Sequence, residues 1–206
     1  MKQQLKTMLE LQDSMNSKVS ADWRVQGFEW YRAIWVECAE LLDHHGWKWW
    51  KKQQPDVEQV VLELIDIWHF GLSIMLQSGL SADDIITKVE SELVIATDET
   101  DFRLDLEAFA GQVLLSKDFE IAGFGRLMAG MELSFDQLHR GYVGKNVLNF
   151  FRQNNGYKDG SYIKVWAGKE DNEHLVDVVR QLDANSSSFS DDVYDALNSR
   201  YKQLTA

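Results

Sequence analysis

The chain has 206 residues, of which 45% are hydrophobic and 12% aromatic, so it is long enough to bury a sizeable core. Its formal net charge of −12 argues against indiscriminate binding to the phosphates of nucleic acids. One cysteine excludes an intrachain disulfide and is typical of a reducing, cytoplasmic compartment. We expect neither a signal peptide nor an uncharged apolar run long enough to span a membrane.

The expected secondary structure is helical. The single proline, Pro55, and long stretches without turn signals favour helices over strands. Apolar residues recur at helical spacing along most of the chain. The sequence therefore predicts one all-α domain over residues 1–206, a bundle of antiparallel helices. In chain order the helices are expected at residues 2–16, 22–43, 56–77, 83–96, 99–115, 118–138, 172–183 and 192–204.

Acidic residues stand in the middle of the helix expected at 56–77. Glu63 and Asp66 share a mixed face with large apolar side chains, although burying an unpaired carboxylate is expensive. The preceding helix carries a second pair with the same spacing, Glu37 and Glu40. Because a short connection joins the two helices, we expect them to be antiparallel neighbours whose four carboxylates converge.

Four neighbouring carboxylates repel one another unless they are protonated or bridged by cations. Hard oxygen ligands of this kind suit Mg²⁺ or Mn²⁺. We therefore predict a metal site, with ordinary surface acids paired with lysines as the alternative. The predicted ligands are Glu37, Glu40, Glu63 and Asp66. Either acid of the first pair could also act as general base, and Glu40 is preferred over Glu37; Cys38 is expected to pack.

These acids resemble the metal-binding signature of the all-α nucleoside triphosphate pyrophosphohydrolases, and within them the dimeric dUTPases. Three further segments resemble motifs of the same family: WKWWK at 47–51, DIWHF at 66–70 and the long segment 145–172. The likeness runs from LELQDSMN near the N-terminus to Asn172, and residues 173–206 are uninformative. It implies a homodimer that uses Mg²⁺, with Mn²⁺ as a substitute, to hydrolyse dUTP and dUDP to dUMP, limiting uracil in DNA.

Cationic side chains gather in the segment 145–172 of this acidic protein. Lys145, Asn149 and Arg152 fall on one face of a helix, where they could hold oxyanions or form a solvated basic face. The resemblance implies that the phosphates contact Lys145, Asn149, Arg152, Tyr157 and Lys164.

A nucleotide base needs a stacking partner and a few fixed polar groups. Gln12 and Asn16 are four residues apart and point the same way from the first helix. The resemblance implies that Gln12, Asn16, Trp49 and Phe70 surround the base and that His69 and Asn172 lie near the sugar. Core packing for the two aromatic residues and a surface role for Gln12 are the alternatives.

Three other functions are compatible with parts of the pattern. The acids alone do not exclude another pyrimidine nucleotide such as dCTP. Asp66 and His69 imitate half of a di-iron carboxylate motif, which requires further Glu and His ligands on other helices. Nothing in residues 83–140 argues against a binding surface, so a helical interaction protein without activity is the third alternative.

Overall fold

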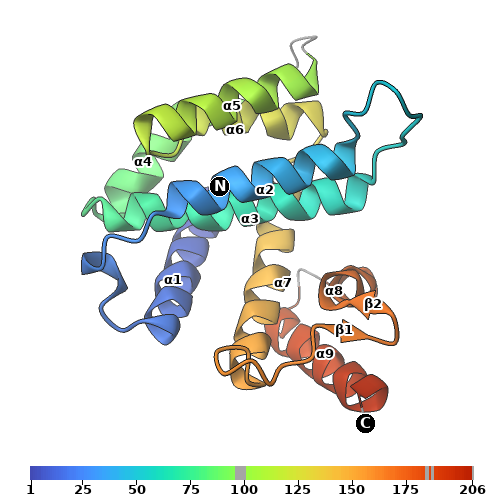
Figure 1. Cartoon of the computed structure of the whole chain (residues 1–206). Helices are drawn as coiled ribbons and strands as arrows, with labels where there is room; N and C mark the ends of the chain where they lie inside the picture. Colours follow the sequence, from blue (N-terminus) through green and yellow to red (C-terminus); the bar gives the residue numbers. More distant parts are fainter. Residues whose placement is uncertain (96–100, 184–185, 187, 206) are drawn as a thin grey trace. The chain divides into compact units, whose positions relative to one another are not determined.

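The computed structural model describes residues 1–95, 101–183, 186 and 188–205. The chain divides into two compact units, Met1–His139 and Arg140–Ala206, each of which is described by itself. Helices make up most of both units (Figure 1), so the all-α prediction is confirmed. The prediction of one domain over residues 1–206 stays a prediction.

Two antiparallel helices form the centre of the first unit. α2 and α3 lie side by side, as expected from their short connection, and α1 packs against α3 while α5 packs against α2 and α6 (Figure 1). The helices are α1 (Lys2–Val19), η1 (Trp23–Val25), α2 (Trp30–His45), α3 (Val57–Gln77), α4 (Ala82–Glu92), α5 (Phe102–Ser116), α6 (Ile121–Gly130) and α7 (Phe135–Asn154), which continues into the second unit.

The core of the first unit is built on α3. Trp68 stacks on Phe124 of α6 with ring centroids 5.2 Å apart, and Phe119 packs edge-on against Trp68 at 5.7 Å. By length and composition alone α3 could cross a membrane, but 72% of its most apolar window is buried inside the structure. This burial is what the core helix of a globular protein shows.

The local sequence explains where α3 begins and ends. The side chain of Asp56 caps the first turn by accepting a hydrogen bond from the backbone N–H of Gln59 at 3.3 Å. The helix stops at Gln77, and Gly79 follows in the left-handed region with φ +83°. The prediction of a helix at 56–77 is therefore confirmed.

Several predicted boundaries are wrong. The helix expected at 22–43 begins only at Trp30, because a 3₁₀ turn and Gly27, with φ +66°, precede it. The helix expected at 118–138 is interrupted after Gly130 by a turn in which Glu132 has φ +51°. The helix expected at 83–96 ends at Glu92. Residue 96, and residues 99–100 of the next predicted helix, lie outside the described residues.

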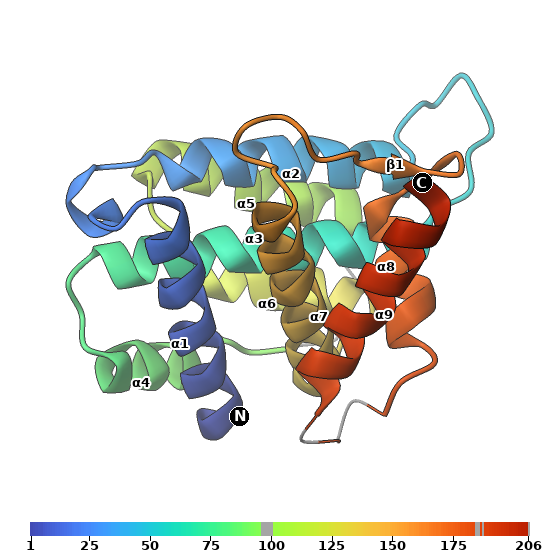
Figure 2. The ribbon, with the colours of Figure 1, turned by 90° about the horizontal axis from the view of Figure 1, so that it is seen from below.

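The second unit combines helices with a short hairpin that was not predicted. β1 (Val165–Trp166) and β2 (Lys169–Glu170) pair antiparallel through Ala167 and Gly168, whose φ values of +48° and +84° suit a tight hairpin turn. α8 (Asp171–Val179) and α9 (Phe189–Thr205) follow (Figure 2). The rings of Phe151, Trp166 and Tyr201 pack edge to face at 5.1–6.1 Å and form the core of this unit.

Candidate active site

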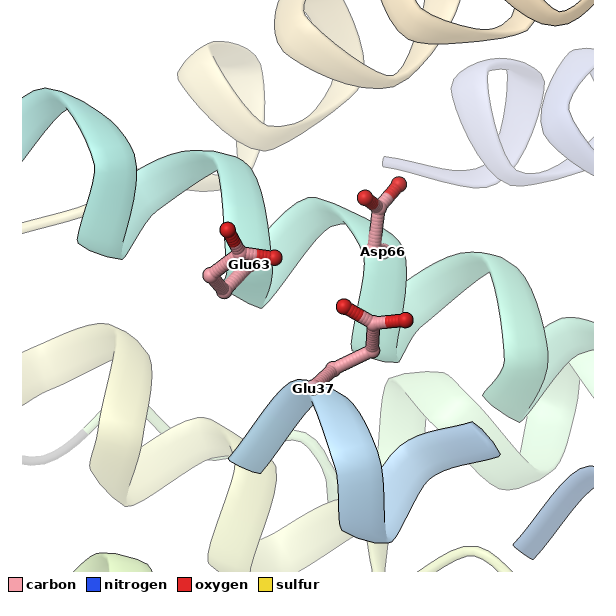
Figure 3. A group of neighbouring side chains, drawn as sticks. All are labelled: Glu37, Glu63 and Asp66. Carbon is pink, nitrogen blue, oxygen red and sulfur yellow. The ribbon is translucent and has the colours of Figure 1, made fainter. Parts of the chain in front are cut away.

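Three carboxylates meet where α2 faces α3 (Figure 3). Glu37 projects from α2, and Glu63 and Asp66 project from successive turns of α3. One carboxylate oxygen of each lies within 4.8 Å of the others. Glu63 is only 5% exposed, so this cluster is set into the protein rather than spread over its surface. The structure thus brings together three of the four predicted metal ligands.

The electrostatics of the cluster favour a bound cation. Burial raises the pKa of Glu37 to about 9, helped by the charge of Asp66 and by a hydrogen bond and the charge from Glu63. Without a metal, Glu37 therefore keeps its proton at neutral pH. A divalent cation would replace that proton and relieve the repulsion, and an all-carboxylate set is the donor chemistry that Mg²⁺ and Mn²⁺ prefer.

Glu40 and Cys38 flank this cluster. Glu40 is exposed on α2, one turn beyond Glu37, and its charge contributes to the raised pKa of Glu37. Cys38 is only 4% exposed, and burial raises the pKa of its thiol to about 12. Cys38 therefore stays a packed thiol, as predicted, and Glu40 is the acid of the quartet that water reaches most readily.

A buried polar network links α1 to α3. The side-chain amides of Gln12 and Asn16 donate to the hydroxyl oxygen of Ser73, each at 3.0 Å, and Gln12 also donates to Asn16 at 3.1 Å. Nδ1 of His69 lies 2.8 Å from Oε1 of Gln12. The surface role considered for Gln12 is wrong, because this residue is only 4% exposed. Ser73 was missed, although it stands one turn beyond His69 on the same helix.

The two aromatic candidates have different surroundings. Phe70 stacks on Trp30, with ring centroids 6.1 Å apart and an interplanar angle of 27°. Trp49 is 90% exposed in the loop between α2 and α3, which argues against core packing for this residue. Oε1 of Gln53 accepts hydrogen bonds from the backbone N–H groups of Trp47 and Lys48 and so braces this loop.

The predicted phosphate-binding residues of the second unit form a network of charged hydrogen bonds. Arg152 donates from two nitrogens to the two carboxylate oxygens of Asp171, both at 2.7 Å, and its Nη1 donates to Oδ1 of Asn149 at 3.3 Å. Nζ of Lys145 donates to Asn172 at 2.9 Å. The sequence interpretation grouped these residues but missed Asp171. Its position next to Asn172, at the start of a helix, could have indicated it.

Asp171 is the anchor of that network. It is fully buried, and although burial raises its pKa, the Arg152 guanidinium and the Tyr162 hydroxyl hold that pKa below its ordinary value. The outer residues are more open: the Tyr157 ring lies 5.8 Å from the guanidinium of Arg152, and Lys164 pairs with Glu170 at 2.9 Å. The buried carboxylate of Asp171 therefore fixes the orientation of the Arg152 guanidinium in this segment.

Comparison with known proteins identifies the family. Residues 4–157, most of the chain, match a family model described as dUTPase. This match includes the acid cluster, the buried amide network and α7. No curated protein matches the chain. The chain therefore belongs to the all-α dUTPase family, whose activity is that of a dUTP diphosphatase.

The raised pKa of Glu37 predicts an unusual stability profile for the metal-free protein. Between pH 4.5 and about 9 the folded Glu37 binds a proton that the unfolded chain does not hold. Raising the pH through this window should therefore lower the melting temperature. Glu37→Gln should flatten this slope, whereas the same exchange at the exposed Glu92 should not. Thermal melts across the window test this, and a slope that Glu37→Gln leaves unchanged would contradict the assignment.

Proposed function

We propose that this member of the dUTPase family hydrolyses dUTP, and also dUDP, to dUMP with Mg²⁺ as its cofactor. The observation that carries the proposal is the cluster of Glu37, Glu63 and Asp66, in which burial, helped by the neighbouring acids, raises the pKa of Glu37 to about 9 in the absence of metal. Mn²⁺ would fit the same oxygen ligands. The lone cysteine supports a cytoplasmic enzyme, which would limit uracil in DNA and supply dUMP.

The acidic residues have distinct roles in this proposal. Glu37, Glu40, Glu63 and Asp66 hold the metal, which when bound neutralises phosphate charge and makes water a stronger nucleophile. Glu40, or Glu37 in its place, accepts the proton of the attacking water on its carboxylate. Exposure of Glu40 suits that role because the proton must then pass to solvent. Phosphoanhydride hydrolysis depends mainly on such positioning and charge neutralisation.

Five residues are proposed to contact the phosphates. Arg152 suits this role because its bidentate bond to Asp171 fixes the plane of the guanidinium before a ligand binds. Tyr157 and Lys164 are both half exposed. The Tyr157 ring lies near the Arg152 guanidinium, and Lys164 pairs with Glu170, the residue before Asp171. The complete set is Lys145, Asn149, Arg152, Tyr157 and Lys164.

The base and sugar are assigned to other residues. Gln12 and Asn16 are proposed to read the uracil edge, with Phe70 and Trp49 as stacking surfaces. Exposure of Trp49 fits a ring that receives a ligand rather than one that packs a core. His69 and Asn172 are proposed to contact the deoxyribose. The alternative substrate, dCTP, would use the same metal and phosphate contacts and differ only at the base.

A panel of deoxynucleoside triphosphates tests the substrate and the metal site together. With Mg²⁺, the wild type should release pyrophosphate fastest from dUTP. Glu63→Gln removes one ligand charge and should lower turnover by a factor of about 100 or more while helicity is kept. Glu58→Gln, on the exposed first turn of the same helix, is the matched control and should keep wild-type turnover.

Two results of that panel would count against the proposal. Near-wild-type turnover of folded Glu63→Gln would exclude the cluster as the metal site. Faster hydrolysis of dCTP than of dUTP by the wild type would replace the proposed substrate with the alternative.

The phosphate assignment is tested with two matched lysines of the second unit. Lys164 and Lys169 are 48% and 53% exposed, and each pairs with a carboxylate. Lys164→Met should lower kcat/KM about tenfold to hundredfold for dUTP and dCTP alike, as expected for a lost hydrogen bond to a charged group. Lys169→Met should have little effect. Equal losses in both variants would show a general effect of charge rather than a contact.

We further propose a homodimer that uses the outer face of α5. Leu104, Ala108, Gly111 and Leu115 are all exposed there, and a side chain added at Gly111 would meet open space. This stripe has the same large-small-small-large order from either end. An antiparallel twofold axis would therefore pair leucine with leucine and bring the small residues together, as a self-complementary interface requires.

Measurement of the mass in solution tests this interface. The wild type should be a dimer, and Leu115→Glu should shift it to monomers because a carboxylate would be buried in the interface against a leucine. The matched control is Val25→Glu, since Val25 is 83% exposed and Leu115 is 81% exposed. A dimer that persists in Leu115→Glu would place the interface elsewhere, and a monomeric wild type would refute the homodimer.

A further inference from the structure

We infer that Ser73 is a positioning residue that fixes which atoms of Gln12, Asn16 and His69 donate and which accept hydrogen bonds. The inference rests on the proposed function, because its consequence is the choice of uracil over cytosine. The four side chains are 0–6% exposed and connect α1 to α3. Their hydrogen bonds form a chain whose polarity follows from one backbone carbonyl.

This series of hydrogen bonds begins at the backbone carbonyl oxygen of His69. Oγ of Ser73 lies 3.0 Å from this oxygen, one helical turn further along α3. A carbonyl oxygen can only accept, so the single hydroxyl proton of Ser73 is directed to it. The hydroxyl oxygen of Ser73 then has only lone pairs to offer to other groups.

The side-chain amides of Gln12 and Asn16 on α1 must therefore donate N–H groups to these lone pairs. Nε2 of Gln12 and Nδ2 of Asn16 each lie 3.0 Å from Oγ of Ser73. The second N–H of Gln12 donates to Oδ1 of Asn16 at 3.1 Å. Turning over either amide would place its carbonyl oxygen against the lone pairs of Ser73, which is costly at so buried a site. Ser73 therefore holds both amides in one orientation.

The polarity passes from Gln12 to the imidazole of His69. Oε1 of Gln12 lies 2.8 Å from Nδ1 of His69. Because an amide oxygen only accepts, Nδ1 must carry the hydrogen, and Nε2 of the neutral ring is then an acceptor. An acceptor at this nitrogen suits the proposed sugar contact, since a deoxyribose hydroxyl can donate to it.

The same polarity discriminates between the bases. Asn16 uses one of its two N–H groups and one lone pair of Oδ1 within the network, so one donor and one acceptor of fixed position can serve a ligand. Uracil offers O4 as an acceptor and N3–H as a donor, whereas cytosine reverses both. An amide free to turn over would suit either base, but an amide held by Ser73 suits only one.

The first test compares kcat/KM for dUTP and dCTP with Mg²⁺ in the wild type and two variants. Ser73→Ala removes the shared acceptor, and the dUTP/dCTP ratio should fall about tenfold or more. Ser78→Ala is the matched control: the Ser78 hydroxyl also donates to a carbonyl of α3, that of Met75 at 2.7 Å, and the ratio should not change. A folded Ser73→Ala that loses rate equally on both nucleotides would overturn the inference.

The second test reads the His69 tautomer directly, by ¹⁵N chemical shifts of the imidazole. The wild type should show hydrogen on Nδ1, and Ser73→Ala should show a mixture with the Nε2–H form. A wild type with hydrogen on Nε2 would overturn the inference even if Ser73→Ala did not fold. A wild type without preference for dUTP would refute the proposed function instead, and the tautomer would still decide whether Ser73 orients this network.

Discussion

The burial and crowding of three carboxyl groups, one of which keeps its proton at neutral pH without a metal, is the constraint on which the first unit depends. Glu37, Glu63 and Asp66 can lie within 4.8 Å of one another only because α2 and α3 pack along their length and hold them there. The unit carries this arrangement on α3, a largely buried helix whose Trp68 stacks on Phe124. In the proposed function a bound cation would relieve this crowding, so the packing of α3 would serve metal binding as well as folding.

Helix α3 also explains why metal and base recognition are coupled in this proposal. The metal acid Asp66 is followed one turn later by Phe70 and, almost two turns later, by Ser73. A helix is stiff over this distance, so the spacing between the carboxylates and the amide network is set by the backbone. The neighbouring helix α1 contributes only groups that Ser73 orients, and its docking therefore completes the proposed base site.

Sequence patterns predicted residue types better than boundaries or orientations. The spacing of Glu63 and Asp66 placed both acids on one face of α3, and the short connection between α2 and α3 brought that face to Glu37. The breaks near Gly27 and Glu132 were missed because apolar periodicity continues across them. Glu132 also adopts a left-handed conformation, which is rare for glutamate and so is not expected from the residue type. Ser73 and Asp171 were missed because a short polar residue in a helix usually faces water, and only tertiary packing buries these two.

Each of these two overlooked residues accepts hydrogen bonds from the donor groups that it orients. Asp171 holds the plane of the Arg152 guanidinium, and Ser73 holds the amides of Gln12 and Asn16. A flexible cation or amide could satisfy many ligands, so selectivity requires that its orientation be settled before the ligand arrives. In each unit that orientation is supplied by a completely buried residue. Specificity in such an enzyme is therefore a property of the residues behind the contact surface as well as of those on it.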